Sequence, residues 1–151
     1  MLDFQKLWDA YPQDWTPCRS LSNGVPNFEN QCAIRMGVAL SRCGFKFNDF
    51  NGEFCWFHPE SDAHILRVEE LLRYLKKKLP KETLTIAKRK YDEPIESEFC
   101  GGRQGIIVFQ NFWGSGNQGD HIDLINEEGE LKSGEDDYFE RSERVYFWDF
   151  S

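Results

Sequence analysis

Apolar residues recur at helical spacing in three segments of the first half of the chain. The spacing predicts a short N-terminal helix that stops at Pro12. A second helix is expected over residues 31–43, with Gly44 as its C-cap, and its residues are apolar or small nearly all round. A third is expected over 68–79, closed by Pro80. Because a helix that is apolar on most sides is typical of a protein interior, we expect the second helix to be central.

The second half of the chain carries short runs that are typical of β-strands. Runs rich in β-branched and aromatic residues predict strands over 83–87, 105–110, 121–126 and 144–150, with a turn at 127–129. Helices therefore come first and strands follow. This order predicts an α+β fold in which N-terminal helices pack on an antiparallel sheet.

Composition and charge narrow the class of protein. The 151 residues are 40% hydrophobic and 15% aromatic, which excludes a disordered chain and predicts a single domain over residues 1–151. A net charge of −8 argues against a nucleic-acid-binding protein, which usually has a basic surface. No segment is apolar for long enough to span a bilayer, and the amphipathic N-terminus is not a Sec signal peptide. We expect a protein made in the cytoplasm, and any export must follow a route other than Sec.

The cysteines do not form the pattern of a metal site or of a disulfide framework. Five are present, which is an odd number, no two have CxxC spacing, and only three histidines accompany them. Neither a zinc site nor another metal centre is expected. Cys43 and Cys55 are candidates for a bridge, although a pair of buried thiols is the preferred interpretation.

One cysteine lies at the N-terminus of a predicted helix, where a thiol is favoured to ionise. Cys32 opens the second predicted helix, with Asn30 as its N-cap. The unsatisfied N–H groups and the helix dipole favour negative charge there, and therefore a thiolate. His121 begins a predicted strand and could take the thiol proton, so the two residues supply the minimal parts of a cysteine hydrolase. The alternative interpretation is that Cys32 is inert packing, as most buried cysteines are.

A third polar group would hold the imidazole in one tautomer. Alternation along the strand places His121 and Asp123 on the same face, so Asp123 is the nearest candidate. Asp136 and Asp137 are alternatives between which the sequence does not decide. Asp123 on a strand is also compatible with a carboxylate that simply faces water.

Residues beside the cysteine are candidates for substrate contacts. The backbone N–H of Cys32, with the side chain of Gln31, could hold an oxyanion. Arg35 lies one turn further on the same helix face and either structures the site or pairs with a substrate carboxylate. The other two histidines, His58 and His64, are expected to be bystanders.

Several segments, in this order, resemble one known family. Asn30–Met36 looks like the nucleophile segment of the type VI secretion amidase effectors of the fourth class, in which a cysteine opens a helix and is followed by x-x-Arg-Met. Gly102–Phe109 and Gly119–Asn126 are similar to that family's Gly-Lys-Lys-Gly-Ile-Ile strand and its histidine strand. Arg67–Leu79 fits the family's helix between the nucleophile segment and these strands. The resemblance covers residues 28–126.

The resemblance implies a papain-like, NlpC-type fold and hydrolysis of peptidoglycan stem peptides at the bond between γ-D-glutamate and meso-diaminopimelate. It implies Cys32 as nucleophile and His121 as base, without a cofactor, and leaves Asp123, Asp136 or Asp137 to serve as the third member. Members of this family are injected by the type VI secretion apparatus into a rival's periplasm, and producers carry a periplasmic immunity protein that plugs the site. The chain departs from the family pattern at Asp120 and at Ile125, where a tryptophan is usual.

Two other functions stay open on the sequence. A non-catalytic binding or immunity-like interaction domain would suit the acidic charge and the aromatic loops. A papain-like enzyme that acts on another amide, such as a transglutaminase or a deamidase, would use the same residues. Thiol reactivity distinguishes the interaction domain from an enzyme. Product analysis distinguishes an enzyme that acts on another amide from a peptidoglycan amidase.

Overall fold

Helices occupy the first half of the described chain, as the hydrophobic spacing predicts. The computed structural model describes residues 2–12, 32–54, 63–90, 93–110, 120–134 and 138–150. Its α-helices are α1 (Phe4–Ala10), α2 (Cys32–Arg42) and α3 (Val68–Lys78). Asp3 caps α1 because its carboxylate accepts hydrogen bonds from the backbone N–H groups of Gln5 (2.9 Å) and Lys6 (3.3 Å). All three helices lie within two residues of their predicted ends.

Helix α2 is packed on most of its surface, as its composition predicts. Its side chains from Cys32 to Leu40 are buried except that of Arg35, and α1 packs against it. Gly37 lets the backbone of α2 lie against the backbone of Ala63, because a Cβ added there would lie 2.2 Å from the carbonyl oxygen of Ala63. The chain leaves the helix through Gly44, whose φ of +85° is the left-handed conformation expected after a helix.

An aromatic cluster follows α2 in the chain and packs around Tyr74 of α3. The rings of Phe45, Phe47 and Phe50 all contact the Tyr74 ring, with centroids 5.2–6.1 Å apart. The Tyr74 hydroxyl donates to the carbonyl oxygen of Lys46 at 2.9 Å. Contacts between rings therefore order residues 45–50, which form neither helix nor strand.

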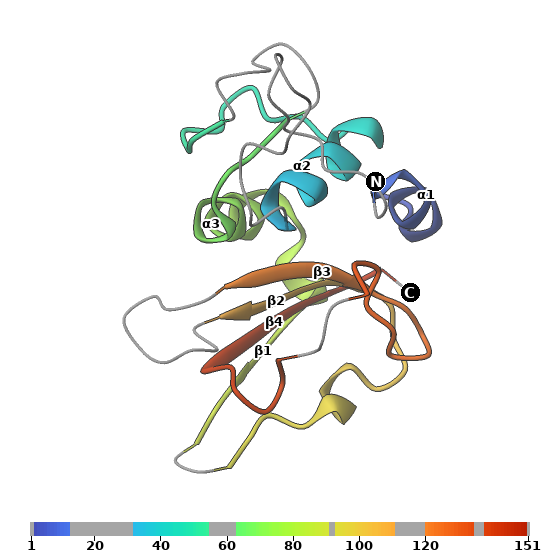
Figure 1. Ribbon diagram of the computed structural model, residues 1–151, viewed down its shortest axis with the longest axis vertical. Helices are drawn as coiled ribbons and strands as arrows, with labels where there is room; N and C mark the ends of the chain where they lie inside the picture. The colour runs from blue at the N-terminus through green and yellow to red at the C-terminus, as the bar shows by residue number, and fades with distance from the viewer. Residues whose placement is uncertain are drawn as a thin grey trace, which may run out of the picture. The chain divides into compact units, whose positions relative to one another are not determined.

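The second half of the chain forms one antiparallel sheet. Its strands are β1 (Leu84–Lys88), β2 (Gly105–Gln110), β3 (His121–Ile125) and β4 (Arg144–Asp149), in the order β1-β4-β2-β3 (Figure 1). Short 3-10 turns, η1 (Lys81–Thr83) and η2 (Ser97–Cys100), precede β1 and β2. Helices followed by an antiparallel sheet confirm the α+β prediction. The two edge strands of this sheet are β1 and β3.

One face of the sheet carries an apolar cluster built by residues of the sheet and of the segments after β1 and β3. Its members are Ile95, Cys100, Ile107, Phe109, Ile125, Phe139, Val145 and Phe147. In the pairing of β2 with β3, Phe109 lies opposite His121 and Ile107 lies opposite Asp123. Because residues opposite one another share a face, His121 and Asp123 stand on the same side of the sheet as this cluster.

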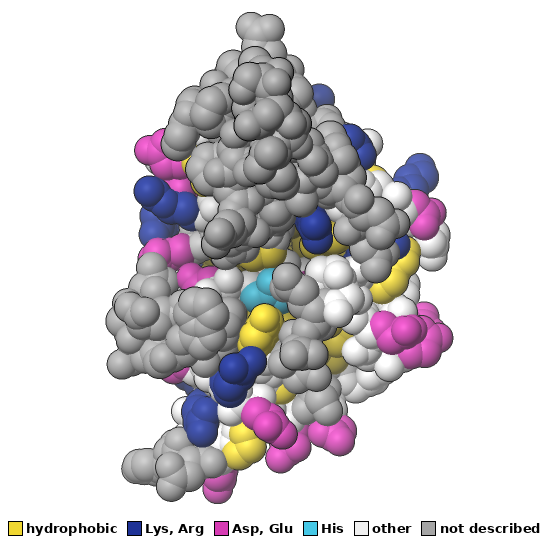
Figure 2. All heavy atoms as spheres, in the orientation of Figure 1, with side chains coloured by type: hydrophobic (Ala, Val, Ile, Leu, Met, Phe, Trp, Pro, Cys, Tyr) yellow, Lys and Arg dark blue, Asp and Glu magenta, His cyan; other side chains and the backbone are white. Residues whose placement is uncertain are grey.

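The chain is organised as two compact units, Met1–Leu75 and Lys76–Ser151. The single-domain organisation expected from the sequence stays a prediction. No helix in the described part of the chain is both long and apolar enough to cross a membrane. On the face drawn in Figure 2, both acidic and basic side chains of the described residues are exposed.

Candidate active site

His121 is the first residue of the edge strand β3, and aromatic rings hold it. Its side chain is almost fully buried, with 3% of the residue exposed. The Phe109 ring stacks on the imidazole at 6.2 Å between centroids and 17° between planes. The Tyr138 ring meets the imidazole edge-on at 5.6 Å. These contacts restrict the imidazole to one orientation.

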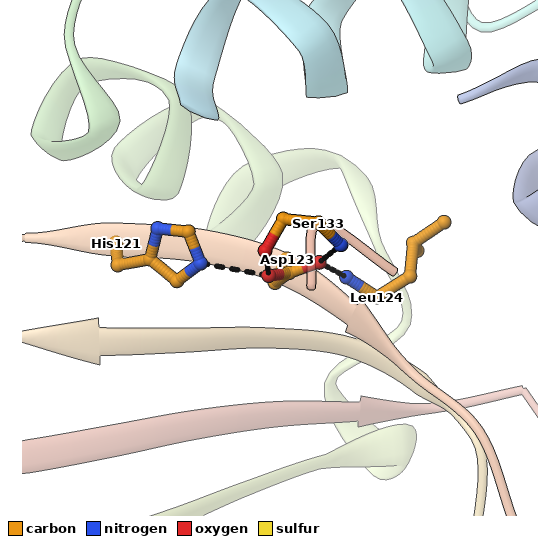
Figure 3. A network of polar contacts seen from close by, with 4 residues as sticks. All are labelled: His121, Asp123, Leu124 and Ser133. Carbon is orange, nitrogen blue, oxygen red and sulfur yellow. Dashed lines mark hydrogen bonds and ion pairs between the residues drawn. The ribbon is translucent and has the colours of Figure 1, made fainter. Parts of the chain in front are cut away.

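Asp123 binds the imidazole directly. Its Oδ2 lies 2.7 Å from Nε2 of His121, and the residue is 0% exposed (Figure 3). The interpretation that Asp123 simply faces water is therefore wrong. The backbone N–H groups of Leu124 (2.8 Å) and Ser133 (3.1 Å) donate to Oδ1, and the Ser133 hydroxyl donates to Oδ2. A buried carboxylate with donors on both oxygens is one whose charge is compensated.

The hydrogen bonds fix which ring nitrogen of His121 carries the hydrogen. The carboxylate of Asp123 accepts from three other donors in addition to the imidazole, so it acts as an acceptor towards His121 as well. Nε2 of His121 is then the donor. In the neutral ring the lone pair lies on Nδ1, which is the nitrogen able to take a proton from a nucleophile.

Cys32 opens helix α2, as the sequence predicts. The residue is buried, with 7% exposed, and its thiol stands at the positive end of the helix dipole. Arg35 follows one turn later and is half-buried, and its Nε is a buried donor that has no hydrogen-bond partner among the described residues. Gln31 and the predicted N-cap Asn30 lie outside the described residues.

Two other cysteines lie within the described residues. Cys43 and Cys100 are free thiols. Burial raises the pKa of the Cys100 thiol to about 11, with a smaller opposing effect from Arg103. Burial, and then the Asp3 carboxylate, also raise the pKa of Cys43. Cys55, the proposed bridge partner of Cys43, lies outside the described residues, as does Cys18.

The structure brings together part of the predicted site. It joins His121 to Asp123, whereas Asp136 and Asp137 lie outside the described residues. Cys32 belongs to the first compact unit and His121 to the second, so their pairing stays a prediction. His64 is buried, and His58 is not described. Within the described ranges, no group of three His, Cys, Asp or Glu side chains could hold a metal ion.

Ser133 is a member of this network that the sequence analysis did not single out. The chain turns after β3 and returns beside it, with Ile125 bridged to Leu131 and the N–H of Lys132 bonded to the Leu124 carbonyl at 2.9 Å. The same register places residue 133 opposite residue 123. The predicted turn at 127–129 implies this pairing of residues 123 and 133, because an antiparallel return about that turn fixes the register.

Comparison with known proteins gives a consistent result. The family model described as type VI secretion system amidase effector protein 4 (Tae4) matches residues 28–148. The chain is similar to Tae4 in a solved Tae4-Tai4 effector-immunity complex from Salmonella Typhimurium, with 22% identity, 100% of this chain and 99% of that chain covered, and a TM-score of 0.72. It is also similar to Tae4 from Enterobacter cloacae, with 18% identity, coverage of 100% and 98%, and a TM-score of 0.71. These likenesses confirm the fold. The search of curated proteins finds no match.

Proposed function

The chain belongs to the type VI secretion system amidase effector protein 4 family, and from this premise we propose that it is a cysteine amidase that hydrolyses peptidoglycan stem peptides. Cys32 is the nucleophile, His121 the general base and acid, and Asp123 the residue that orients the imidazole. The observation that carries the proposal is the buried contact of 2.7 Å between His121 Nε2 and Asp123 Oδ2. It fixes the ring so that Nδ1 carries the lone pair required of a base.

The reaction follows from these roles. His121 Nδ1 takes the Cys32 proton, and the thiolate attacks the amide carbonyl carbon to form a C–S bond. The oxyanion is held by N–H donors, for which the backbone of Cys32 and the side chain of Gln31 are candidates. The imidazolium returns its proton to the leaving amine as the C–N bond breaks. Water then loses a proton to His121 and attacks the thioester, which releases the acid and restores the thiol.

The proposed substrate is the bond between γ-D-glutamate and meso-diaminopimelate in the stem peptide. Carboxylates flank this bond, and a guanidinium is the side chain best suited to recognise them. Arg35 has a buried Nε without a partner among the described residues, and it lies one turn after Cys32. This unsatisfied donor supports a substrate role for Arg35, because a buried donor that stays unpaired costs free energy.

The proposed site of action is the periplasm of a rival cell, reached from the producer's cytoplasm through the type VI secretion apparatus. Solved structures from Salmonella Typhimurium and Enterobacter cloacae hold Tae4 with the immunity protein Tai4. By analogy, we propose that a cognate immunity protein binds this chain and blocks access to Cys32. Membership of an amidase family favours an enzyme over the interaction domain that the sequence left open.

The direct test is digestion of purified sacculi followed by mass spectrometry of the soluble fragments. The wild-type protein is expected to release stem-peptide fragments cut after γ-D-glutamate. Cys32→Ala should reduce the rate by at least about 10³-fold, because the nucleophile is gone. Cys43→Ser is the matched control, since it alters a free thiol beyond the other end of α2, and should keep the wild-type rate. Undiminished cleavage by Cys32→Ala would overturn the proposal.

A further inference from the structure

The segment after β3 folds back along that strand and forms a tight hairpin. The side chain of Asn126 holds the turn, because its Oδ1 accepts from the backbone N–H groups of Glu128 (3.1 Å) and Glu130 (2.9 Å). Gly129 supplies the left-handed residue of the turn, with φ of +81°. The register set by this turn brings Ser133 to the buried carboxylate of Asp123.

Ser133 makes two hydrogen bonds to Asp123, and they go to different carboxylate oxygens. Its backbone N–H donates to Oδ1, the oxygen that also accepts from the Leu124 N–H. Its hydroxyl donates to Oδ2, the oxygen that accepts from His121 (Figure 3). The backbone bonds anchor one oxygen, and the hydroxyl fixes the other, so the carboxylate cannot rotate about its Cβ–Cγ bond without breaking them.

We propose that Ser133 is a positioning residue of the amidase site, whose hydroxyl holds Asp123 Oδ2 in the direction of His121 Nε2. The inference rests on the proposed function, because it needs His121 to act as the base. A serine that served only to compensate a buried charge could donate to either oxygen. Donation to the oxygen shared with the imidazole couples the hydroxyl to the orientation of the ring.

The test is steady-state kinetics on a defined stem peptide with the full chain. Ser133→Ala should lower kcat by about 10- to 100-fold with KM within about twofold, as for loss of a group that orients a reacting residue. Ser133→Thr keeps the hydroxyl and should restore most of kcat. Combined with Asp123→Asn, Ser133→Ala should add no further loss, because both act through the same carboxylate.

A matched control removes a hydroxyl at the other edge of the sheet. Thr83 donates its hydroxyl to the Pro80 carbonyl at 2.8 Å, and Thr83→Val should leave kcat unchanged. Wild-type kcat in Ser133→Ala, or losses that multiply in the double variant, would overturn the inference. If Ser133→Ala does not fold, Ser133→Gly also lacks the hydroxyl and keeps the backbone N–H, and wild-type kcat there overturns the inference equally.

The failure of the parent proposal has its own signature. Activity that survives Cys32→Ala removes the cysteine mechanism, whatever Ser133 does. Loss of activity in Cys32→Ala together with wild-type kcat in Ser133→Ala leaves the mechanism intact and removes only the role of Ser133.

Discussion

The two edge strands of the sheet differ in how far they are buried. All five residues of β3 are buried, and the chain that returns after it bridges Ile125 to Leu131 on its outer side. Strand β1 has no buried residue, and its Ile86 is 45% exposed. No described segment pairs with the outer edge of β1. Such an edge is tolerated where the strand is short and charged, and β1 ends at an exposed Lys88. The covered edge is the one that carries the histidine and its carboxylate.

Covering the edge changes the chemistry available there. In a buried site of low dielectric, the hydrogen bond between an imidazole and a carboxylate is electrostatically stronger, and an unpaired charge is more costly. Asp123 meets this requirement with donors from Leu124 and Ser133 as well as His121. The hairpin therefore both shields the strand and supplies donors.

The largest effect is expected at the buried carboxylate of the covered edge. Asp123→Asn should lower kcat by about 10³–10⁴-fold, because an amide does not hold the imidazole in the tautomer that a base requires. Steady-state kinetics on a stem peptide measures it. Glu130→Gln is the matched control, since Glu130 is an exposed carboxylate of the same hairpin and accepts from the Asn126 side chain. Retained activity in Asp123→Asn would move the orienting role to Asp136 or Asp137.

The thiol of Cys100 reports how well water is excluded from the cluster that shares a sheet face with His121. Its pKa is raised from 9.0 to about 11 by burial, so below pH 11 the thiol stays mostly protonated in the folded protein. At pH 8 its thiolate fraction is about 100-fold below that of an unshifted thiol, and alkylation by iodoacetamide should slow by about that factor. Peptide mapping before and after denaturation measures it. Equal rates in the two states would show that this face is wet.

The turn of the hairpin is expected to respond more modestly. Gly129 has φ of +81° and no neighbouring atom within 4 Å of an added Cβ, so Gly129→Ala carries only backbone strain. The free energy of unfolding should fall by about 1–2 kcal/mol, measured by urea denaturation. Gly44→Ala is matched in strain and open space, with φ of +85°, but lies outside the hairpin. Only Gly129→Ala should also lower kcat, and an equal effect of both variants on kcat would separate the hairpin from catalysis.

The open edge should show the smallest response. Ile86→Thr removes an exposed apolar side chain from β1 and should change the free energy of unfolding by less than about 0.5 kcal/mol. Activity should stay at the wild-type level, and self-association measured by light scattering should not increase. A loss well above that limit would mean that β1 is covered in solution.

Period-two alternation was enough to predict the central contact of the site. Placing His121 and Asp123 on one face of a strand required only their spacing, and the contact of 2.7 Å between them agrees with it. Their roles in catalysis stay a prediction. The burial of Asp123 was not predictable in the same way, because it depends on the chain that returns through Ser133 rather than on the strand itself.

The positions where the sequence analysis was less accurate have local causes. The first strand was predicted over 83–87 and runs over Leu84–Lys88, because Lys81–Thr83 forms a 3-10 turn after Pro80. Ser133 can be found from the sequence only by extending the strand pairing beyond the predicted turn at 127–129. Contacts formed by a hairpin follow from its register, whereas contacts between distant segments do not.

The network of His121, Asp123 and Ser133 is encoded in thirteen consecutive residues, 121–133. Contacts of such short sequence separation have a small loop-closure entropy, and hairpins close in about 1–10 µs. The orienting side chains can therefore assemble without waiting for slower long-range steps. The same locality makes this stretch a natural cassette, and exchanging it as a block between relatives should carry the geometry of the base with it.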